Sequence, residues 1–464
     1  MSAKQLGIDK NGIQLTMRQK DLWSYGAGVL GISVITGVIG QISYFYTDKV
    51  GMAAGLAGSA LLITKIADAF TDLIMGQIVD HTKSKYGKAR PWMLWMAIPA
   101  FLSVAALLCV PQGLSDTGKF IYAILSNIFA SAIVCTAISV PYACLLNYRT
   151  RSQVERTGMN IRRTICNYIT GMIFNVAFIP VTKAMGGTQA AWIKAGLVLA
   201  AVGMLGMFLC FKVVHEEENL SQNVTGGSEN SVPFIKGLKL IFTNKYWIIM
   251  ALAQLVANIC YGLTGATNSY YARWIFGDES IVGIMGLIGF LPTILGFFIV
   301  SPLVKKFGPT NVVKGALVLG VVGTIGRALL PRSFWAVCVF GSLSGISTMP
   351  FMMVGMVLVA NVADFEEWRS GNQIVGLVNS ATSFGGKVGS GVGAGLVGWI
   401  LEWGGYVGTA EVQTDSAIQS IFAVSIWLPG ILTLILLLLM IAYDMDKKYP
   451  NFRKELQARH KKNA

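Results

Sequence analysis

The sequence predicts an all-α membrane protein with twelve transmembrane helices in two six-helix bundles. Hydrophobic residues make up 54% of the 464 residues and charged residues only 13%, whereas soluble domains carry about 25% charged residues. Apolar runs such as 92–110, 195–211 and 421–443 approach or exceed the roughly 20 residues that a helix needs to cross a bilayer. An ordinary soluble fold is therefore excluded, and the lipid bilayer is an expected partner.

Charged, Gly-rich or Pro-rich breaks separate the expected spans. The spans cover residues 22–46, 52–79, 92–111, 119–147, 158–184, 192–213, 246–274, 281–304, 312–331, 334–363, 374–402 and 417–443. The longest polar stretch, 215–245, contains three consecutive glutamates and a Ser/Asn/Gly-rich run, which is typical of a linker. We therefore expect an N-terminal six-helix bundle over 1–214, a cytoplasmic linker over 215–245, a C-terminal six-helix bundle over 246–443 and a cytoplasmic tail over 444–464.

The basic residues predict the orientation. The formal net charge is +14, and the lysines and arginines gather in the short segments on one side of the expected membrane rather than on one soluble face. Cytoplasmic segments of membrane proteins carry this excess. We therefore expect a multi-pass protein of the bacterial inner membrane with both termini in the cytoplasm, and no nucleic-acid partner.

Two carboxylates are expected inside the second span. Asp68 and Asp72 are four residues apart, which puts both on one face of a helix. A charge at this depth is costly unless it is paired or hydrated, and two neighbouring carboxylates either share a proton or bind a small cation. This pattern predicts a proton or cation site, with both carboxylates as metal ligands if the ion is Na⁺. The structural alternative is an ion pair with Lys65 or another lysine of the bundle.

Further polar residues could contact a substrate. Lys387 is the one lysine of the eleventh span and lies among glycines that permit close helix approach, although snorkelling to an interface is the alternative. Arg163 follows Arg162 where the fifth span begins, so a substrate role competes with a topology signal. Tyr25 and Tyr142 could line a sugar cavity, although such residues more often pack or anchor at the interface.

An acidic group follows the tenth span. Asp364, Glu366 and Glu367 are expected at the cytoplasmic surface. Pairing of this group with Arg149 or Arg156 would form a gate, and a solvated charge cluster is the alternative.

Signatures of other classes are absent from the sequence. It contains no GxxxxGK[ST] loop, no HExxH and no GxSxG, which disfavours ATP coupling, protease activity and esterase activity. We expect no enzyme and no cofactor other than a coupling ion. Two alternatives from other classes stay open, namely a membrane enzyme acting on lipid-linked sugars and a sugar sensor that signals through its tail.

Four segments resemble the glycoside-pentoside-hexuronide:cation symporter family of the major facilitator superfamily, whose best-known member is the melibiose carrier. They are residues 25–28 with 46–48, residues 68–76 followed by 83–92, residues 140–142 and residues 363–368. They occur in the family's order over nearly the whole chain. The resemblance implies a major facilitator fold, a monomer, and symport of a sugar or glycoside with Na⁺ or H⁺ by alternating access.

The resemblance also implies roles for individual residues. Asp68 and Asp72 match the carboxylates that bind the coupling cation, and Thr136 matches a further cation ligand. Lys387 matches a lysine that contacts both the cation site and the sugar. Arg163 matches an arginine near the sugar.

Departures from the family pattern bear on the ion and the substrate. Thr71 replaces the asparagine often found between the two carboxylates in sodium users, so proton coupling gains support. Ser33 and Ser139 stand where galactoside carriers have aspartates that hold sugar hydroxyls, and Ala143 stands where they have a stacking aromatic residue, so Tyr142 would have to substitute. The loss of two negative charges favours an anionic substrate, such as a glucuronide, a sugar acid or a sulfonated sugar. A neutral glycoside or pentoside is the alternative.

Overall fold

The computed structural model of the protein describes residues 15–150, 152–216, 242–370 and 375–445, together with Lys448 and Glu455. For some residues inside these ranges only the backbone is described. Every regular element in this part of the chain is a helix. The helices divide into two compact units.

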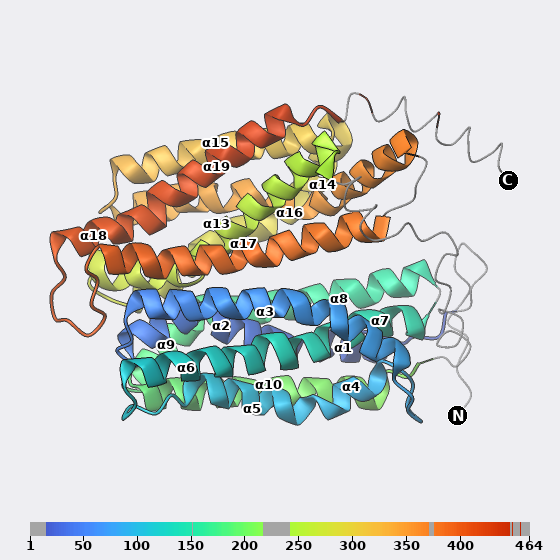
Figure 1. Ribbon diagram of the computed structural model, residues 1–464, viewed down its shortest axis with the longest axis horizontal. Helices are drawn as coiled ribbons and strands as arrows, with labels where there is room; N and C mark the ends of the chain where they lie inside the picture. Colours follow the sequence, from blue (N-terminus) through green and yellow to red (C-terminus); the bar gives the residue numbers. More distant parts are fainter. Residues whose placement is uncertain are drawn as a thin grey trace. The chain divides into compact units, whose positions relative to one another are not determined.

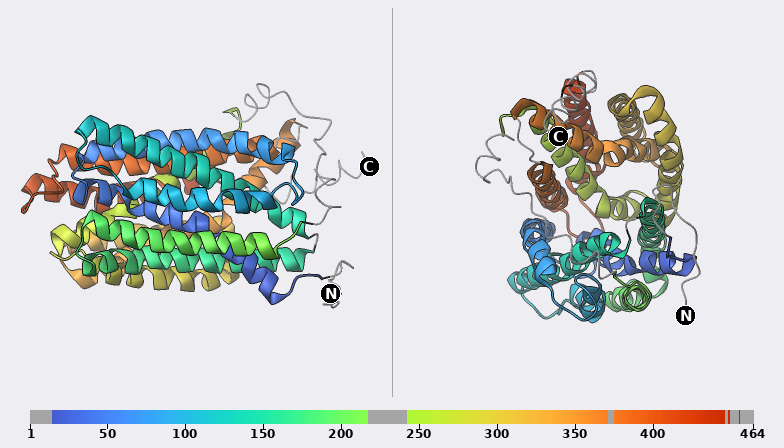
Figure 2. Two further views of the ribbon diagram at one scale, coloured as in Figure 1. Left: turned by 90° about the horizontal axis from the view of Figure 1, so that it is seen from below. Right: turned by 90° about the vertical axis from the view of Figure 1, so that its right-hand side faces the viewer.

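The first unit contains α1 to α10, many of which join end to end. Helices α1 and α2, α4 and α5, α6 to α7, and α8 to α9 follow one another with at most one residue between them, so each set forms one rod. These rods run side by side, as the blue to green segments in the left view of Figure 2 show. The bounds are α1 (Gln19–Gly28), α2 (Leu30–Asp48), α3 (Ala54–His81), α4 (Arg90–Trp95), α5 (Ala97–Leu108), α6 (Asp116–Asn127), the π-helix η1 (Ile128–Cys135), α7 (Thr136–Arg149), α8 (Gln153–Met172), the π-helix η2 (Ile173–Ala177), α9 (Phe178–Ala184) and α10 (Gln189–Val213).

The second unit contains α13 to α19. Here α13 packs along α17, and α15 packs along α16 (Figure 1). The bounds are α13 (Lys245–Ile275), α14 (Ile281–Phe307), α15 (Pro309–Leu329), α16 (Phe334–Ser370), α17 (Val375–Trp403), α18 (Asp415–Phe422), the π-helix η3 (Ala423–Trp427) and α19 (Leu428–Ala442).

The predicted all-helical membrane fold is confirmed. Each of the twelve expected spans coincides with a helix or a continuous rod, and nine helices of the described residues are long and apolar enough to cross a membrane. Large apolar side chains such as Val198 (65% exposed) and Leu205 (63%) lie on the surface of α10, as expected of a surface that faces lipid. The tenth rod is longer than expected, since α16 continues beyond residue 363 to Ser370.

Both ends of the predicted linker are held by side-chain contacts to backbone amides. The Glu216 carboxylate accepts hydrogen bonds from the backbone N–H groups of Lys88 (2.9 Å), Ala89 (2.8 Å) and Arg90 (2.6 Å) at the start of α4. The Asn244 side chain accepts from two backbone N–H groups in the first turn of α13. Backbone N–H groups at the start of a helix have no hydrogen-bond partner within the helix, so side chains often supply one. The predicted linker is therefore fastened to a helix at each end, and its residues 217–241 lie outside the described residues.

Four residues of the predicted tail are described, namely Asp444, Met445, Lys448 and Glu455. Asp444 accepts a hydrogen bond from the Tyr246 hydroxyl at 2.9 Å and pairs with Lys448 at 3.0 Å. The contact with Lys448, followed by that with Tyr246, lowers the pKa of the Asp444 carboxyl below its usual value. The tail thus begins as an extension of the second unit.

Glycines allow α10 to approach α1 and α2 closely. A Cβ atom added to Gly206 would lie 2.5 Å from the Ala27 carbonyl oxygen, and one added to Gly203 would lie 3.2 Å from Gly31 Cα. Small residues are frequent at membrane helix interfaces because attraction there depends on close van der Waals packing. Gly206 and Gly203 therefore determine the separation of α10 from α1 and from α2, respectively.

We expect Gly206→Ala to destabilise the first unit by about 1–3 kcal/mol, because the added methyl group meets backbone that cannot move alone. The melting temperature of the detergent-solubilised protein, followed by fluorescence-detected size exclusion, measures the effect. Gly40→Ala is the matched control, since a Cβ atom at Gly40 meets nothing within 4 Å. Equal melting temperatures for the two variants would contradict the packing argument.

Candidate functional site

Asp68 is a buried carboxylate on α3. Its side chain belongs to a residue only 6% exposed, and Oδ1 accepts a hydrogen bond from Thr136 Oγ1 at 3.1 Å. Oδ2 lies 3.4 Å from Lys65 Nζ, which is also 3.3 Å from Ser131 Oγ. The structure thus brings Asp68 together with Thr136, as the family resemblance implies, and also contains the ion pair with Lys65 that was the structural alternative.

A π-helix presents Ser131 and Thr136 to α3. The segment η1 ends at Cys135, directly before Thr136, and packs against α3. A π turn takes more residues than an α turn, so it rotates the side chains that follow relative to those before, and such turns are frequent at functional sites. The residues of η1 follow no pattern that would have revealed this turn in the sequence.

Thr71 and Asp72 are the other two predicted cation ligands. The Thr71 hydroxyl donates to the backbone carbonyl of Asp68 at 3.1 Å, so it is turned toward its own helix rather than toward the Asp68 carboxylate. Asp72 lies one turn further along α3, and its side chain is outside the described residues. No cluster of three or more His, Cys, Asp or Glu residues suited to a metal ion occurs among the described residues.

Tyr25 and Tyr142 form a buried stacked pair between α1 and α7. Both are 0% exposed, and their rings stack with centroids 4.6 Å apart and planes 13° apart. The Tyr142 hydroxyl donates to the Tyr25 carbonyl oxygen at 2.6 Å, and the Tyr25 hydroxyl donates to the Tyr142 carbonyl oxygen at 3.2 Å. Arg163 Cζ lies 5.7 Å from the centroid of the Tyr142 ring. Because both rings are fully buried, the pair does not line an open cavity. Its contact with the candidate site is the Tyr142 ring, which lies beside the Arg163 guanidinium.

We expect Tyr142→Phe to lower stability by about 1 kcal/mol and to leave the KM for sugar unchanged, because the ring stack survives and only the 2.6 Å hydrogen bond is lost. Melting temperature and uptake kinetics measured on the same preparation separate the two effects. A clear rise in KM at unchanged stability would instead assign Tyr142 to the sugar site.

The two serines that replace family aspartates differ in their surroundings. Ser33 is 4% exposed, and its hydroxyl donates to Asn167 Oδ1 on α8 at 2.7 Å. Ser139 is half-buried, and its hydroxyl lies 3.4 Å from the Thr136 carbonyl on its own helix. Asn167 was not among the predicted site residues, although an asparagine in an apolar span is a signal that would have justified its inclusion.

Lys387 lies on α17 in the second unit and is half-buried. Gly389 packs against the Leu255 carbonyl oxygen of α13, where an added Cβ atom would lie 2.6 Å away, and Gly386 packs against Asn258. The glycine-rich surroundings expected from the sequence therefore hold α17 against α13.

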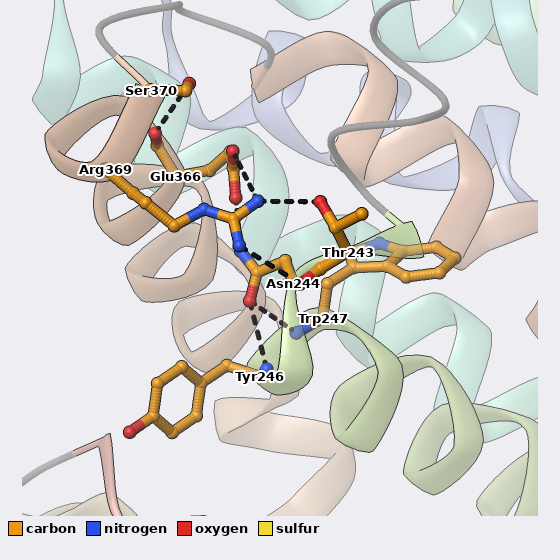
Figure 3. Close-up of polar contacts among 7 residues, drawn as sticks. All are labelled: Thr243, Asn244, Tyr246, Trp247, Glu366, Arg369 and Ser370. Atoms are coloured by element: carbon orange, nitrogen blue, oxygen red, sulfur yellow. Dashed lines mark hydrogen bonds and ion pairs between the residues drawn. The ribbon is translucent and has the colours of Figure 1, made fainter.

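The acidic group of α16 lies within the last turns of the helix rather than after it. Glu366 is 0% exposed; its carboxylate accepts hydrogen bonds from Asn244 Nδ2 at 2.7 Å and from Arg369 at 3.1 Å (Figure 3). Arg369 also bonds the Thr243 carbonyl and hydroxyl oxygens. Of the two alternatives left open for this group, a gate and a solvated charge cluster, the second does not hold for Glu366, because these contacts bury it against the start of α13.

The predicted gate residues divide between the two units. Asp364 and Glu367 are half-buried on α16, and Arg149 is half-buried in the last turn of α7. Their proposed pairing stays a prediction.

Helical rods of membrane-spanning length with a buried acidic residue inside the second rod are typical of a transporter of the major facilitator class. The chain belongs to the MFS/sugar transport protein family, whose model matches residues 24–447. It is a multi-pass membrane protein and a secondary transporter.

Curated relatives span nearly the whole chain. The chain is 27% identical to an isoprimeverose transporter of Lactiplantibacillus pentosus over 90% of this chain and 87% of that protein. It is 28% identical to a putative glycoside/cation symporter of Escherichia coli over 88% and 87%, and 26% identical to a putative sulfoquinovose importer of the same organism over 95% and 94%.

A solved structure supports the fold. A crystal structure of the nucleoside transporter NupG superimposes with a TM-score of 0.63 at 13% identity, over 92% of this chain and 99% of that chain. At this identity the likeness shows the fold alone.

Proposed function

We propose that this protein imports a sugar together with a cation across the cytoplasmic membrane of a bacterium, as a monomer with both termini in the cytoplasm. The observation that carries the proposal is the Asp68 carboxylate, which is 6% exposed in an apolar helix and bonded to Thr136 and Lys65. A charge in such a place is expensive to maintain, so a function is the default reading.

The cation site is proposed at Asp68, Asp72, Thr136 and Thr71. Asp68 Oδ1 and Thr136 Oγ1 supply oxygen ligands from two helices, 3.1 Å apart, and oxygen is the donor that hard cations prefer. A Na⁺ ion would compete with the Lys65 ammonium for Asp68, whereas a proton on Asp68 would release Lys65. Either event changes the pairing between α3 and the π-helical rod, which is how an ion could alter the substrate affinity of the protein.

An anionic sugar is the proposed substrate. Arg163 and Lys387 supply positive charge, and Ser33 and Ser139 supply neutral hydroxyls where galactoside carriers have aspartates. The relative described as a putative sulfoquinovose importer, named for a sulfonated sugar, supports this class. The relative described as an isoprimeverose transporter supports the second candidate, a neutral glycoside.

The proposed mechanism is alternating access. Cation binding raises sugar affinity, and sugar binding must raise cation affinity by the same factor. The two bundles then rock to open the opposite side, and Asp364, Glu367 and Arg149 are proposed to pair as a cytoplasmic gate.

Uptake into membrane vesicles tests the function. Labelled glucuronides, sugar acids, sulfonated sugars and neutral glycosides are offered under a sodium gradient or a proton gradient. Concentrative uptake that is abolished by the ionophore for one ion identifies that ion and the sugar class together. Absence of uptake for every sugar under both gradients would refute symport, and accumulation of neutral glycosides alone would refute the anionic class.

A further inference from the structure

The helix α8 has three distinct faces. Met159 (0% exposed) and Thr170 (3%) lie on a buried face, consistent with the packing of α8 against α1 and α2. A second face exposes large apolar side chains at intervals of three and four residues: Ile161 (48%), Ile165 (38%), Ile169 (54%) and Met172 (39%). This second face has the composition of a surface that contacts lipid.

The third face is exposed but polar. Asn160, Thr164 and Asn167 are exposed at positions i, i+4 and i+7, which lie on one stripe of a helix. With 3.6 residues per turn, this stripe is about 130° around the helix from the isoleucines. Unpaired amides are disfavoured in hydrocarbon, because nothing there can replace their hydrogen bonds to water. The polar stripe is therefore expected to face water or a polar ligand, not lipid.

Asn167 is oriented by a buried partner. The Ser33 hydroxyl donates to Asn167 Oδ1 at 2.7 Å, and Ser33 itself is only 4% exposed. Oδ1 accepts this bond, and the two N–H donors of Nδ2 make no hydrogen bond to a described residue. The result is an exposed pair of donors on a side chain held by the protein interior.

We propose that Asn167, oriented by Ser33, is a specificity-determining residue that donates a hydrogen bond to a hydroxyl group of the transported sugar. The inference rests on the proposed function, since it assigns one part of the substrate site. The Asn167 amide can donate through Nδ2, whereas a carboxylate only accepts. A hydroxyl oxygen can accept this bond on an anionic sugar and on a neutral one. Asn167 therefore recognises a hydroxyl in both classes, and the charge of the sugar must be recognised by other residues.

Thiol labelling tests the polar stripe without any sugar. Asn160→Cys and Asn167→Cys are compared with Ile165→Cys and Ile169→Cys, using a charged, membrane-impermeant methanethiosulfonate and subtracting the label taken up by the unsubstituted protein with its seven cysteines. We expect the first two to react at least about tenfold faster, because a thiol in hydrocarbon ionises poorly. Equal rates for the two faces would overturn the inference.

Kinetics test the hydroxyl contact. Asn167→Leu is expected to raise the KM for the transported sugar by about tenfold, the effect of one lost hydrogen bond, and to lose the discrimination between that sugar and one deoxy analogue. Asn167→Ser serves as a second variant in case the leucine variant does not fold, and Ile165→Leu is the control. Unchanged KM and unchanged discrimination would overturn the role of Asn167 while symport stands. Failure of the wild-type protein to take up any sugar would instead refute the proposed function, and the labelling rates would still decide whether the stripe faces water.

Discussion

Replacing Asp68 by asparagine is expected to abolish cation-driven accumulation of sugar and to leave at most equilibration across the membrane. The amide keeps the size of the side chain but carries no charge and cannot exchange a proton at neutral pH. Hydrogen bonds to a charged group are worth about 1.5–3 kcal/mol, so cation affinity should fall by roughly 10- to 100-fold. Vesicle uptake at varied cation concentration measures this change.

Two controls sharpen the Asp68 experiment. Asp116→Asn makes the same substitution at an exposed position in the first turn of α6, so it should accumulate sugar normally. Thr136→Ser should retain the 3.1 Å contact with Asp68, whereas Thr136→Val should lose it. Normal accumulation by Asp68→Asn would remove Asp68 from the coupling site.

Replacing Glu366 by alanine is expected to cause the largest loss of stability. The carboxylate is 0% exposed and accepts hydrogen bonds from Asn244 and Arg369, so its removal takes this acceptor from both side chains (Figure 3). Hydrogen bonds to a charged group are worth about 1.5–3 kcal/mol each. Arg369 is 33% exposed and keeps its bonds to Thr243, so we expect a total loss of about 3 kcal/mol. The melting temperature in detergent should fall by several degrees, and expression should decline with it.

The Glu366 experiment also separates a structural role from a gating role. Glu366→Gln retains the size and one acceptor, so it should melt between the alanine variant and the wild-type protein. Glu402→Ala, at an exposed position on α17, is the control and should melt as the wild-type protein does. A stable Glu366→Ala protein with altered transport would show that Glu366 acts in the transport cycle instead of fastening α16 to α13.

The local sequence pattern was sufficient to predict the helices and to single out Asp68 as the main acidic candidate. Each apolar run corresponds to a helical rod because a segment in lipid must satisfy its own backbone hydrogen bonds, and a helix does so within the segment. Asp68 could be recognised because a carboxylate in such a run is costly wherever it points. Lys65 could be named as its alternative partner because three residues along a helix bring two side chains to one face.

Contacts between distant residues could not be predicted in the same way. The Asn167 side chain is held by Ser33, 134 residues away in sequence, and Glu366 is held by Asn244, 122 residues away. Spacing along one helix carries no information about which neighbouring helix a side chain will meet. For this reason neither the burial of Glu366 nor the contact between Ser33 and Asn167 was predicted.

The sequence by itself determined that this protein crosses a membrane many times, that it carries a carboxylate within the second span, and that it resembles cation-coupled sugar carriers. Only the tertiary structure decided that Asp68 contacts Thr136 and Lys65, that Tyr25 and Tyr142 are buried against each other, and that Ser33 orients Asn167. The physical reason is that hydrophobicity acts on each segment independently. Hydrogen bonds between helices, in contrast, depend on rotation and register, which packing of the whole bundle determines.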